Sequence, residues 1–586
     1  MEQYYTNERN VQLLIGLLKA HGIKRIVASP GSTNVTIVGS LQQDPYFEMY
    51  SCVDERSAAY MAVGIASETG EPVMLSCTGA TASRNYFSAL TEAFYRKLPI
   101  LAVTSTQDES KVGNMIPQVI DRTCQPKDTI KMSFHIQPIK DQDDEWDCMR
   151  KINEAILELD HHGKGPVHIN LTTKYSKDFS VKNLPSVHKI MRYNSEDKSF
   201  PEIPCDAKVA IYVGTHLVWS KELTELVDRF CENYNAVVFT DTVSNYVGKY
   251  RVNYTLVELQ AGKKNFNQSP DILIHMGNMS DECRKCGTPQ HVWRLSDDGL
   301  LSDRFQKLDY VFEMTEIKFF EIYNQGKVPI KTSYYESCIA EINRVNNAFP
   351  EIPFSHIWIA SKLHDKLPKH SVLHLGILSP LRSWSFFDID PTVEMCCNQG
   401  GFGIDGNMST LVGASLINKN KLYYAVVGDL SFFYDLNILG NRHIGNNIRI
   451  LLINNSLGSE FHLFKQLNCI YVNDIDKFIS AGGHNGRKSL TLVKHFAEDL
   501  GFEYISASTK QAFEDAAERF VSPNISDKSI IFEVFTNVED ENKALYDVWH
   551  IFDDSNTSAL IKQKAKSIIG QKNIDKAKEI INIIKK

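Results

Sequence analysis

Hydrophobic positions in the N-terminal part of the chain follow two alternating patterns. A helical spacing comes first, at Val11, Leu14, Ile15 and Leu18, and Gly22 follows where such a helix would end. Short apolar runs of strand length come next, in the stretches IKRIVAS, PVMLSC and LPILAV, with helical stretches between them. This alternation predicts parallel strands joined by helices that cover both faces of a sheet.

The same alternation returns twice further along the chain. Strand-like runs from KVAIYVG to LDYVFEM form a second set, and runs from SVLHLG to SIIFEVF form a third. We therefore expect an α/β protein of three consecutive domains with parallel sheets. The predicted parts are a first domain at 1–185, a Rossmann-like central domain at 195–330, a third domain at 345–545 and a Lys-rich helical tail at 546–586. The polar stretch 172–204 is expected to connect the first two domains.

Composition and charge narrow the class of protein. The 586 residues carry a formal net charge of −8 with a pI near 6.2, which excludes a general nucleic-acid-binding surface. No apolar run reaches the roughly 18 residues of a membrane span, and the polar start MEQYYTNERN is unlike a secretory signal. The 12 cysteines are scattered and are typical of reduced thiols, so we expect a cytoplasmic protein.

One strand of the third domain ends in an unusual junction. The apolar run YYAVV is followed at once by Gly428 and Asp429, and an apolar helix-like segment begins there. Ligands of parallel sheets bind at such carboxyl ends, and a helix N-terminus suits a phosphate. Gly428 would let the backbone approach a ligand closely, and Ser431 could bond a phosphate oxygen. Taken alone, Asp429 better fits an ordinary helix cap.

The next strand ends in a second polar pair. The run IRILLI is followed by Asn454 and Asn455, which alone would indicate only a turn. Two consecutive parallel strands place Asp429 and Asn455 at one edge of the sheet. Their side-chain oxygens and the backbone carbonyl of Leu457 make a ligand set suited to Mg²⁺. Together the two junctions predict a metal–diphosphate site.

Five motifs together resemble those of the thiamine diphosphate (ThDP) dependent enzymes. They are GDL (428–430) followed by NN (454–455), SPGS (29–32), ER (55–56), ALTEAF (89–94) and NQGGFGIDGNMST (398–410). The stretch GDLSFFYDLN is most similar to the MenD family of menaquinone-pathway synthases, which join 2-oxoglutarate to isochorismate. The resemblance covers nearly the whole chain. It implies pyrimidine-binding, central and diphosphate-binding domains in that order, a central domain without FAD, and a homodimer or homotetramer with active sites between subunits.

The resemblance also implies roles for single residues. Glu55 would be the catalytic carboxylate that faces N1′ of the aminopyrimidine, and Ile404 would support the bent cofactor. Asp429, Asn455 and the backbone carbonyl of Leu457 would hold Mg²⁺. Further contacts to ThDP are expected at Gly428, Leu430, Ser431, Gln399, Gly400 and Phe402.

The residues expected around the substrate differ in charge from the MenD pattern. Thr33, Gln107 and Gln399 stand where that family has arginine, and Glu460 stands where it has an apolar residue. Arginine binds carboxylates through paired hydrogen bonds, so losing these cations does not suit a multiply anionic substrate. Arg382 is retained and could hold a distal carboxylate of the donor. The predicted substrate set is Ser32, Thr33, Gln107, Gln118, Arg382, Glu460 and Phe461.

We therefore expect an enzyme that uses ThDP and Mg²⁺ to decarboxylate a 2-oxo acid. It would transfer the acyl group to an acceptor other than isochorismate. Three alternatives stay open: a MenD enzyme acting on 2-oxoglutarate and isochorismate, a simple 2-oxo acid decarboxylase, and a non-catalytic homologue. The stretch RTCQPKD and the surroundings of SPGS lack the adjacent histidines that simple decarboxylases favour. The presence of Glu55, Asp429 and Asn455 together disfavours a non-catalytic role.

Overall fold

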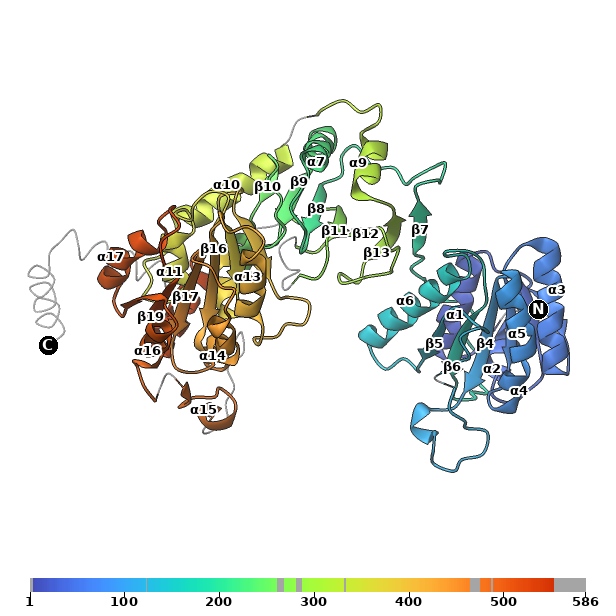
Figure 1. Ribbon diagram of the computed structural model, residues 1–586. Helices are drawn as coiled ribbons and strands as arrows, with labels where there is room; N and C mark the ends of the chain where they lie inside the picture. Colours follow the sequence, from blue (N-terminus) through green and yellow to red (C-terminus); the bar gives the residue numbers. More distant parts are fainter. Residues whose placement is uncertain are drawn as a thin grey trace, which may run out of the picture. The chain divides into compact units, whose positions relative to one another are not determined.

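The chain folds into two compact units. A computed structural model describes residues 4–122, 124–260, 268–280, 287–330, 333–463, 475–485 and 488–552. The first unit comprises residues 1–198 and 297–313, and the second comprises residues 199–296 and 314–586 (Figure 1). Of the predicted tail, residues 546–549 belong to the last helix, and the part from residue 553 onward lies outside the described residues.

The first unit contains a six-stranded parallel sheet in the order β2-β1-β3-β4-β6-β5. Its strands are β1 (Arg25–Ala28), β2 (Glu48–Ser51), β3 (Val73–Cys77), β4 (Ile100–Thr106), β5 (Ser133–Ile136) and β6 (Val167–Thr172). Its helices are α1 (Arg9–Ala20), α2 (Val35–Leu41), α3 (Glu55–Thr69), α4 (Thr81–Asn85), α5 (Phe87–Arg96) and α6 (Gln142–Glu158).

Each face of this sheet has its own hydrophobic core. The cross-strand row Ile26, Met74 and Leu101 packs with α1 and α6 on one face. The next row, which begins with Val27 and Leu75, packs with α3 and α5 on the other face. Successive residues of a strand point to opposite faces of the sheet. When helices cover both faces, the residues on each face must therefore be apolar. The four apolar positions that predicted the first helix are fully buried in α1, which confirms that prediction.

The middle of the chain contributes strands to both units. In the first unit, β7 (Met191–Asn194) pairs in parallel with β13 (Leu308–Glu313). In the second unit the order is β10-β9-β8-β11-β12. These strands are β8 (Val209–Val213), β9 (Val237–Thr240), β10 (Arg251–Val252), β11 (Ile272–Met276) and β12 (His291–Ser296), with helices α7 (Lys221–Tyr234), α8 (Thr255–Gln260), α9 (Glu316–Asn324) and α10 (Ser333–Asn347).

The sequence did not predict strand β7. It lies inside the stretch 172–204, which we expected to connect the first two domains. None of its four residues is buried, so the strand has the composition of a linker. The backbone of β7 pairs with that of β13, and the side-chain pattern of β7 does not predict this pairing.

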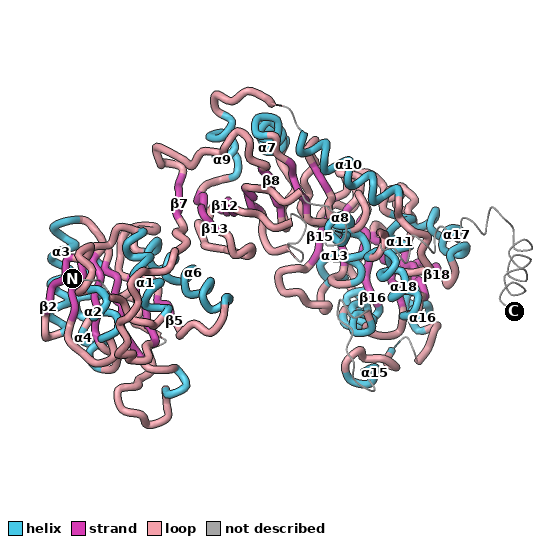
Figure 2. Tube along the Cα trace, turned by 180° about the vertical axis from the view of Figure 1, so that it is seen from behind, coloured by secondary structure: helices cyan, strands magenta, loops and turns pink. Residues whose placement is uncertain are grey.

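The second unit also contains a six-stranded parallel sheet, in the order β15-β14-β16-β17-β19-β18. Its strands are β14 (Val372–Leu375), β15 (Glu394–Cys397), β16 (Tyr423–Gly428), β17 (Ile448–Asn454), β18 (Glu503–Ala507) and β19 (Ile530–Phe535). Its helices are α11 (His356–Leu363), α12 (Ser379–Ser385), α13 (Asn407–Ser415), α14 (Asp429–Tyr434), α15 (Ile475–Phe478), α16 (Leu492–Asp499), α17 (Lys510–Phe520) and α18 (Val538–Trp549). Figure 2 shows helices around this sheet from behind.

The two six-stranded sheets share one topology. If strands are counted from the start of each sheet, both run 2-1-3-4-6-5. In each, the strand order reverses between the first and third strands, and ligands of parallel sheets bind outside the carboxyl ends at such a point. SPGS directly follows β1, and Asp429 directly follows β16. Both motifs therefore lie at the carboxyl ends of the strands. The predicted α/β class with parallel sheets is confirmed, whereas the exact domain boundaries stay predictions.

Candidate active site

Asp429 is a buried carboxylate at the carboxyl end of β16. The residue is 5% exposed and accepts a hydrogen bond from the Leu430 N–H at 2.7 Å. Burial raises the pKa of Asp429 to about 7, although the backbone N–H groups of Leu430, Ser456 and Leu457 favour the charged form. No lysine, arginine or histidine among the described residues forms an ion pair with it. A bound cation would stabilise such a carboxylate.

The two asparagines after β17 have different environments. Asn454 is buried, and its Nδ2 donates to Glu533 Oε1 at 2.7 Å, so this side chain fastens β17 to β19. Asn455 is half-buried; its Oδ1 accepts from the Leu457 N–H at 3.4 Å and its Nδ2 donates to Ser459. The backbone N–H groups of Ser456 and Leu457, in the turn after β17, form hydrogen bonds with the Asp429 carboxylate. The structure therefore brings the two side chains predicted to bind the metal, Asp429 and Asn455, to one edge of the sheet.

Ser431 is connected to two residues from the NQGGFGIDGNMST stretch. Its hydroxyl donates to the Ile404 carbonyl at 2.8 Å and accepts from Asn407 Nδ2 at 2.8 Å. These bonds fasten the start of α14 to the half-buried Ile404 and to the first residue of α13. We did not predict Asn407 as a site residue, although it lies within the NQGGFGIDGNMST motif.

The loop after β15 presents an open backbone and one unsatisfied donor. Gln399 is buried, and its Oε1 accepts from Thr215 Oγ1 at 2.8 Å, while its Nε2 is buried with no hydrogen-bond partner among the described residues. A Cβ at Gly400 or Gly428 would meet no atom of the described part of the chain within 4 Å. Phe402 is 42% exposed and has a left-handed φ of 52°. This loop offers space and a donor to a ligand.

Two of the predicted substrate residues form an ion pair with each other. Arg382 of α12 donates to Glu460 through Nη1 at 3.0 Å and through Nη2 at 2.6 Å. The side chains are 15% and 9% exposed, so the pair is well shielded from water. Arg382 follows β14, and Glu460 lies in the 3₁₀ turn 459–462 after β17. The neighbouring Phe461 is half-buried. The cation expected to bind a substrate is thus already matched by a carboxylate.

Glu55 begins α3 directly after β2. Asp54 caps this helix by accepting from the Ser57 N–H at 2.7 Å, which places Glu55 in the first turn. Glu55 is half-buried, and its Oε2 accepts from Asn85 Nδ2 at 3.2 Å. Asn85 ends α4 and was not predicted, because no local pattern relates it to Glu55. The arrangement holds the carboxylate at one orientation while part of it stays open to solvent.

The remaining predicted residues of the first unit are tied to their own neighbourhood. Thr33 is buried and its hydroxyl lies 2.5 Å from that of Ser105. Gln107 is half-buried and accepts from Lys111 Nζ at 2.7 Å. Ser32 and Gln118 are exposed. A Cβ at Gly31 would lie 1.9 Å from the Thr78 side chain, which explains the glycine in SPGS. Their roles toward a substrate stay predictions.

A buried arginine lies at the same end of this sheet. Arg122 is 4% exposed; Nη1 donates to Thr104 Oγ1 at 2.7 Å, and Nη2 donates to the Ser105 carbonyl at 3.3 Å and to Asn170. Within the described part of the chain it has no carboxylate partner. Burial lowers the pKa of Arg122 to about 10. The sequence offered no signal for it, since its partners come from β4 and β6.

The Arg122 network fixes the tautomer of His168. Because Thr104 Oγ1 accepts from Arg122, its proton can go to His168 Nε2 at 2.7 Å. His168 Nδ1 then donates to Ser133 Oγ at 2.8 Å. His168 is neutral in this network, and burial lowers its pKa to about 3.

We expect a His168→Gln variant to change how stability depends on pH. The folded pKa is about 3 against 6.5 in the unfolded chain, so the contribution of neutral His168 is complete above pH 6.5 and is lost as pH falls. Relative to the variant, the wild type should lose about 1.4 kcal/mol per pH unit between 6.5 and 3. Urea unfolding of both proteins at several pH values measures this difference, and a pH-independent difference would contradict the assignment.

No helix of the described residues is both long and apolar enough to cross a membrane.

Comparisons with a family model and with related sequences indicate the same family of enzymes. Residues 9–126 match the family described as "Thiamine pyrophosphate enzyme, N-terminal TPP binding domain". A protein of Bacteroides fragilis named 2-succinyl-5-enolpyruvyl-6-hydroxy-3-cyclohexene-1-carboxylate synthase is 32% identical over 572 residues, covering 93% of this chain and 99% of the relative. A Bacteroides thetaiotaomicron protein of the same name is 32% identical over 567 residues, with the same coverage.

A solved structure also aligns with the chain. It is a thiamine diphosphate-dependent 4-hydroxybenzoylformate decarboxylase of Rhodococcus jostii, with 17% identity, a TM-score of 0.38, and coverage of 90% of this chain and 99% of that one. The sequence relatives align with nearly the full length of this chain and of their own chains, and they therefore decide the family assignment. The chain therefore belongs to the thiamine diphosphate-dependent enzymes, in the family of 2-succinyl-5-enolpyruvyl-6-hydroxy-3-cyclohexene-1-carboxylate synthases.

Proposed function

We propose that Asp429, Asn455 and the backbone carbonyl of Leu457 hold Mg²⁺ for the diphosphate of ThDP. The buried carboxylate of Asp429, whose pKa burial raises to about 7, supports this proposal because a divalent ion would replace its lost hydration. The open space above Gly400 and Gly428 supports a cofactor there. The proposed cofactor contacts are Gly428, Leu430, Ser431, Gln399, Gly400, Phe402, Ile404 and Asn455.

Glu55 is the proposed catalytic residue. When bound, ThDP supplies the carbon centre that adds to a 2-oxo acid and accepts the electron pair released with CO₂. Glu55 would exchange a proton with N1′ of the aminopyrimidine, which is the task of a positioned general acid–base. Its hydrogen bond from Asn85 fixes one carboxylate oxygen and leaves the other for this exchange. Ile404, held through Ser431, would support the cofactor rings from below.

We further propose that the reaction transfers the acyl group of a decarboxylated 2-oxo acid to an acceptor other than isochorismate. The bond to the carboxyl carbon breaks, CO₂ leaves, and a new carbon–carbon bond to the acceptor forms. Thr33, Gln107 and Gln399 carry this proposal, because these uncharged side chains stand where the MenD pattern has arginines that bind carboxylates. The Arg382–Glu460 pair concerns the donor, since a cation already paired with a shielded carboxylate is a poor anchor for another carboxylate. Ser32, Thr33, Gln107, Gln118 and Phe461 complete the proposed substrate surroundings.

Product analysis tests the acceptor. Purified enzyme with ThDP, Mg²⁺ and 2-oxoglutarate is given isochorismate or a panel of less anionic aldehydes and ketones. We expect carbon–carbon products with the panel and little product with isochorismate. The alternative, a MenD activity, is favoured by the names of the relatives at 32% identity. Efficient turnover of isochorismate would establish that alternative, and aldehyde release under every condition would indicate a simple decarboxylase.

A Glu460→Gln variant should change donor preference. Without its carboxylate partner, Arg382 becomes available to the distal carboxylate of a donor such as 2-oxoglutarate. We expect the KM for 2-oxoglutarate to fall by about tenfold, equivalent to about 1.4 kcal/mol, the size of one charge-assisted hydrogen bond. The KM for a 2-oxo acid without a second carboxylate should change little. Equal shifts for both donors would show that Arg382 does not face the substrate.

A homo-oligomer with active sites between subunits is also proposed. Helix α3 and the residues before it carry exposed apolar side chains beside Glu55, namely Val53 at 78%, Tyr60 at 46% and Met61 at 38% exposure. Apolar side chains gathered on one helix are typical of a contact surface between subunits. This surface supports an assembly in which Glu55 lies at the subunit boundary.

A further inference from the structure

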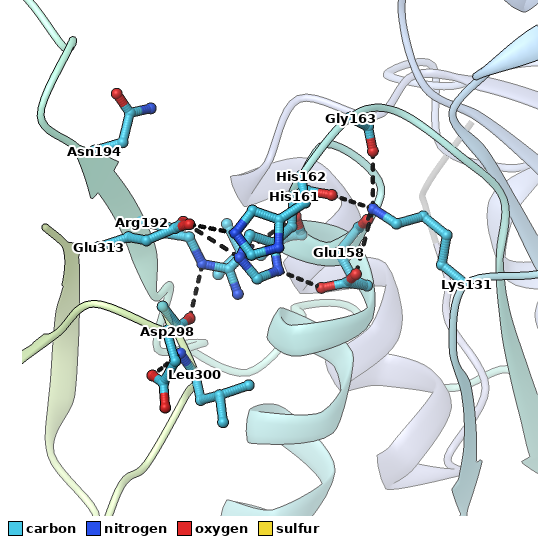
Figure 3. A network of polar contacts seen from close by, with 12 residues as sticks. Lys131, Glu158, His161, His162, Gly163, Arg192, Asn194, Asp298, Leu300 and Glu313 are labelled. Carbon is cyan, nitrogen blue, oxygen red and sulfur yellow. Dashed lines mark hydrogen bonds and ion pairs between the residues drawn. The ribbon is translucent and has the colours of Figure 1, made fainter.

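A second cluster of ligand-type side chains lies in the first unit, apart from the residues discussed above. It joins the turn after α6 to the end of β13 (Figure 3). His161 and His162 are adjacent in the turn, with their rings stacked at a centroid distance of 3.8 Å. Both face Glu313, the last residue of β13, which lies 151 residues away from His162 in the sequence. Glu158, the last residue of α6, lies on the far side of His161.

The hydrogen bonds decide which nitrogen of His161 is available. Nδ1 lies 2.8 Å from Glu158 Oε2, so Nδ1 carries the proton that this carboxylate accepts. With the proton on Nδ1, Nε2 presents its lone pair toward Glu313 Oε2 at 3.3 Å. Among the described residues this nitrogen has no hydrogen-bond partner, although His161 is only 9% exposed. Two electron-rich atoms facing each other in a buried position call for a cation between them.

The outer partners of the cluster hold this orientation. Glu158 is paired with Lys131, whose Nζ lies 3.3 Å from Oε1. The same ammonium group donates to the backbone carbonyls of Glu158, His161 and Gly163, which fixes the turn that carries the histidines. A carboxylate that accepts from the second ring nitrogen is the usual support for a metal-binding histidine. Arg192 donates to the carbonyls of Gly299 and Leu157. Burial lowers the pKa of Arg192, and the nearby carboxylates of Glu158 and Glu313 oppose this shift.

We propose that His161 Nε2, His162 Nε2 and the carboxylate of Glu313 bind a divalent transition-metal ion such as Zn²⁺. One ligand atom from each of these residues lies within 4.8 Å of the others. Two imidazoles and a carboxylate suit zinc, and three protein ligands leave a fourth position for water. His162 Nε2 already lies 2.6 Å from Glu313 Oε1, and the exposed His162 side chain, at 66%, gives water access. The ion would fasten α6 to β13 within the first unit.

His162→Asn is the most informative variant. His162 has a left-handed φ of 49°, a conformation that asparagine tolerates better than most residues, so this change should preserve the turn while removing one ligand. Glu158→Gln keeps an acceptor for His161 Nδ1 and removes only the outer charge. His443→Asn, an exposed histidine outside the cluster, is the matched control.

Metal binding is measured on full-length protein with ThDP and saturating Mg²⁺. We expect wild type and His443→Asn to retain one zinc ion per chain after dialysis, and to give the intense visible bands of tetrahedral or five-coordinate Co²⁺. Glu158→Gln should bind roughly 10- to 100-fold more weakly, as is usual when an outer partner is changed. His162→Asn should lose more affinity than that and should lose the Tm increase that Zn²⁺ gives the wild type.

Two results would overturn the proposal. One is a wild type that retains no zinc. If His161 then carried a proton on both ring nitrogens at neutral pH, the cluster would be a protonated imidazole held between the carboxylates of Glu158 and Glu313. The other is a His162→Asn variant with unchanged stoichiometry and Co²⁺ spectrum, which would place the ion elsewhere, for example on cysteine thiols. Loss of binding with an unchanged Tm of the metal-free variant supports the proposal, since it excludes unfolding as the cause.

Discussion

A Glu55→Gln variant is expected to lose at least about a hundredfold in kcat, because a positioned general acid–base contributes roughly 10²–10⁴-fold to the rate. Glutamine keeps the hydrogen bond from Asn85 and the start of α3 but cannot exchange a proton with the cofactor. The loss should therefore appear in kcat while Mg²⁺-dependent ThDP binding and Tm stay close to the wild type. Steady-state kinetics of 2-oxo acid consumption, with cofactor titration by fluorescence, measures both.

The matched control for this experiment is Glu68→Gln. Glu68 lies on the same helix and is exposed, so its replacement removes an equal charge from α3 without touching the proposed site. The control should retain full activity. Full activity of the Glu55→Gln variant would contradict the assignment of Glu55, and an unchanged cellular function of that variant would favour a non-catalytic homologue.

An Asp429→Asn variant should bind ThDP and Mg²⁺ far more weakly while the protein alone becomes more stable. Losing a charged partner of a buried ion costs about 3 kcal/mol, or roughly a hundredfold in Kd. Without metal, however, the wild-type protein must keep a carboxylate that is 5% exposed and has no cation among the described residues. Asparagine removes that cost, so Tm of the cofactor-free variant should rise. Calorimetric titration and thermal unfolding with and without Mg²⁺ measure the two effects.

Asp435→Asn gives the opposite pattern and serves as the control. Asp435 closes the same segment and accepts from the Ser409 N–H at 2.6 Å and from the Ser409 hydroxyl at 2.5 Å. Its replacement should lower Tm and leave Mg²⁺ affinity nearly unchanged. If Asp429→Asn instead lowers Tm without weakening metal binding, Asp429 acts only as a structural carboxylate and the proposed metal site is wrong.

The fold could be predicted because its strands are buried on both faces. Runs such as IKRIVAS and YYAVV are apolar at every position that helices cover, and only a parallel sheet with two helical layers requires this. The four-residue strand β7 escaped prediction for the opposite reason, since none of its residues is buried. A strand that is stabilised mainly by backbone pairing cannot be recognised from its pattern of apolar side chains.

The candidate site could be predicted only where chain order determines proximity. Asp429 and Asn455 follow adjacent parallel strands, so their neighbourhood follows from topology. The hydrogen bond from Asn85 to Glu55 and that from Asn407 to Ser431 depend on how separate helices pack, and no spacing rule connects these residues. Such contacts are set by tertiary packing rather than by local pattern.

Charge in the substrate region shows the same limit. The sequence identified Arg382 and Glu460 separately, one as a retained cation and the other as a gained carboxylate. It did not show that the two side chains form an ion pair, because they lie 78 residues apart, one on α12 and the other in the 3₁₀ turn 459–462. That pairing joins two substrate residues that we predicted separately. It makes Arg382 a poor anchor for the distal carboxylate of a donor.

We propose that this ThDP enzyme depends on Mg²⁺, decarboxylates a 2-oxo acid and transfers the acyl group to an acceptor. CO₂ release from a panel of 2-oxo acids, with and without an acceptor pool, tests it most directly. We expect release from at least one acid, acceleration by an acceptor, and loss of release when ThDP or Mg²⁺ is omitted or Glu55 is replaced by glutamine. CO₂ release that persists without ThDP, or no release from any acid by the fully supplied wild type, would contradict it.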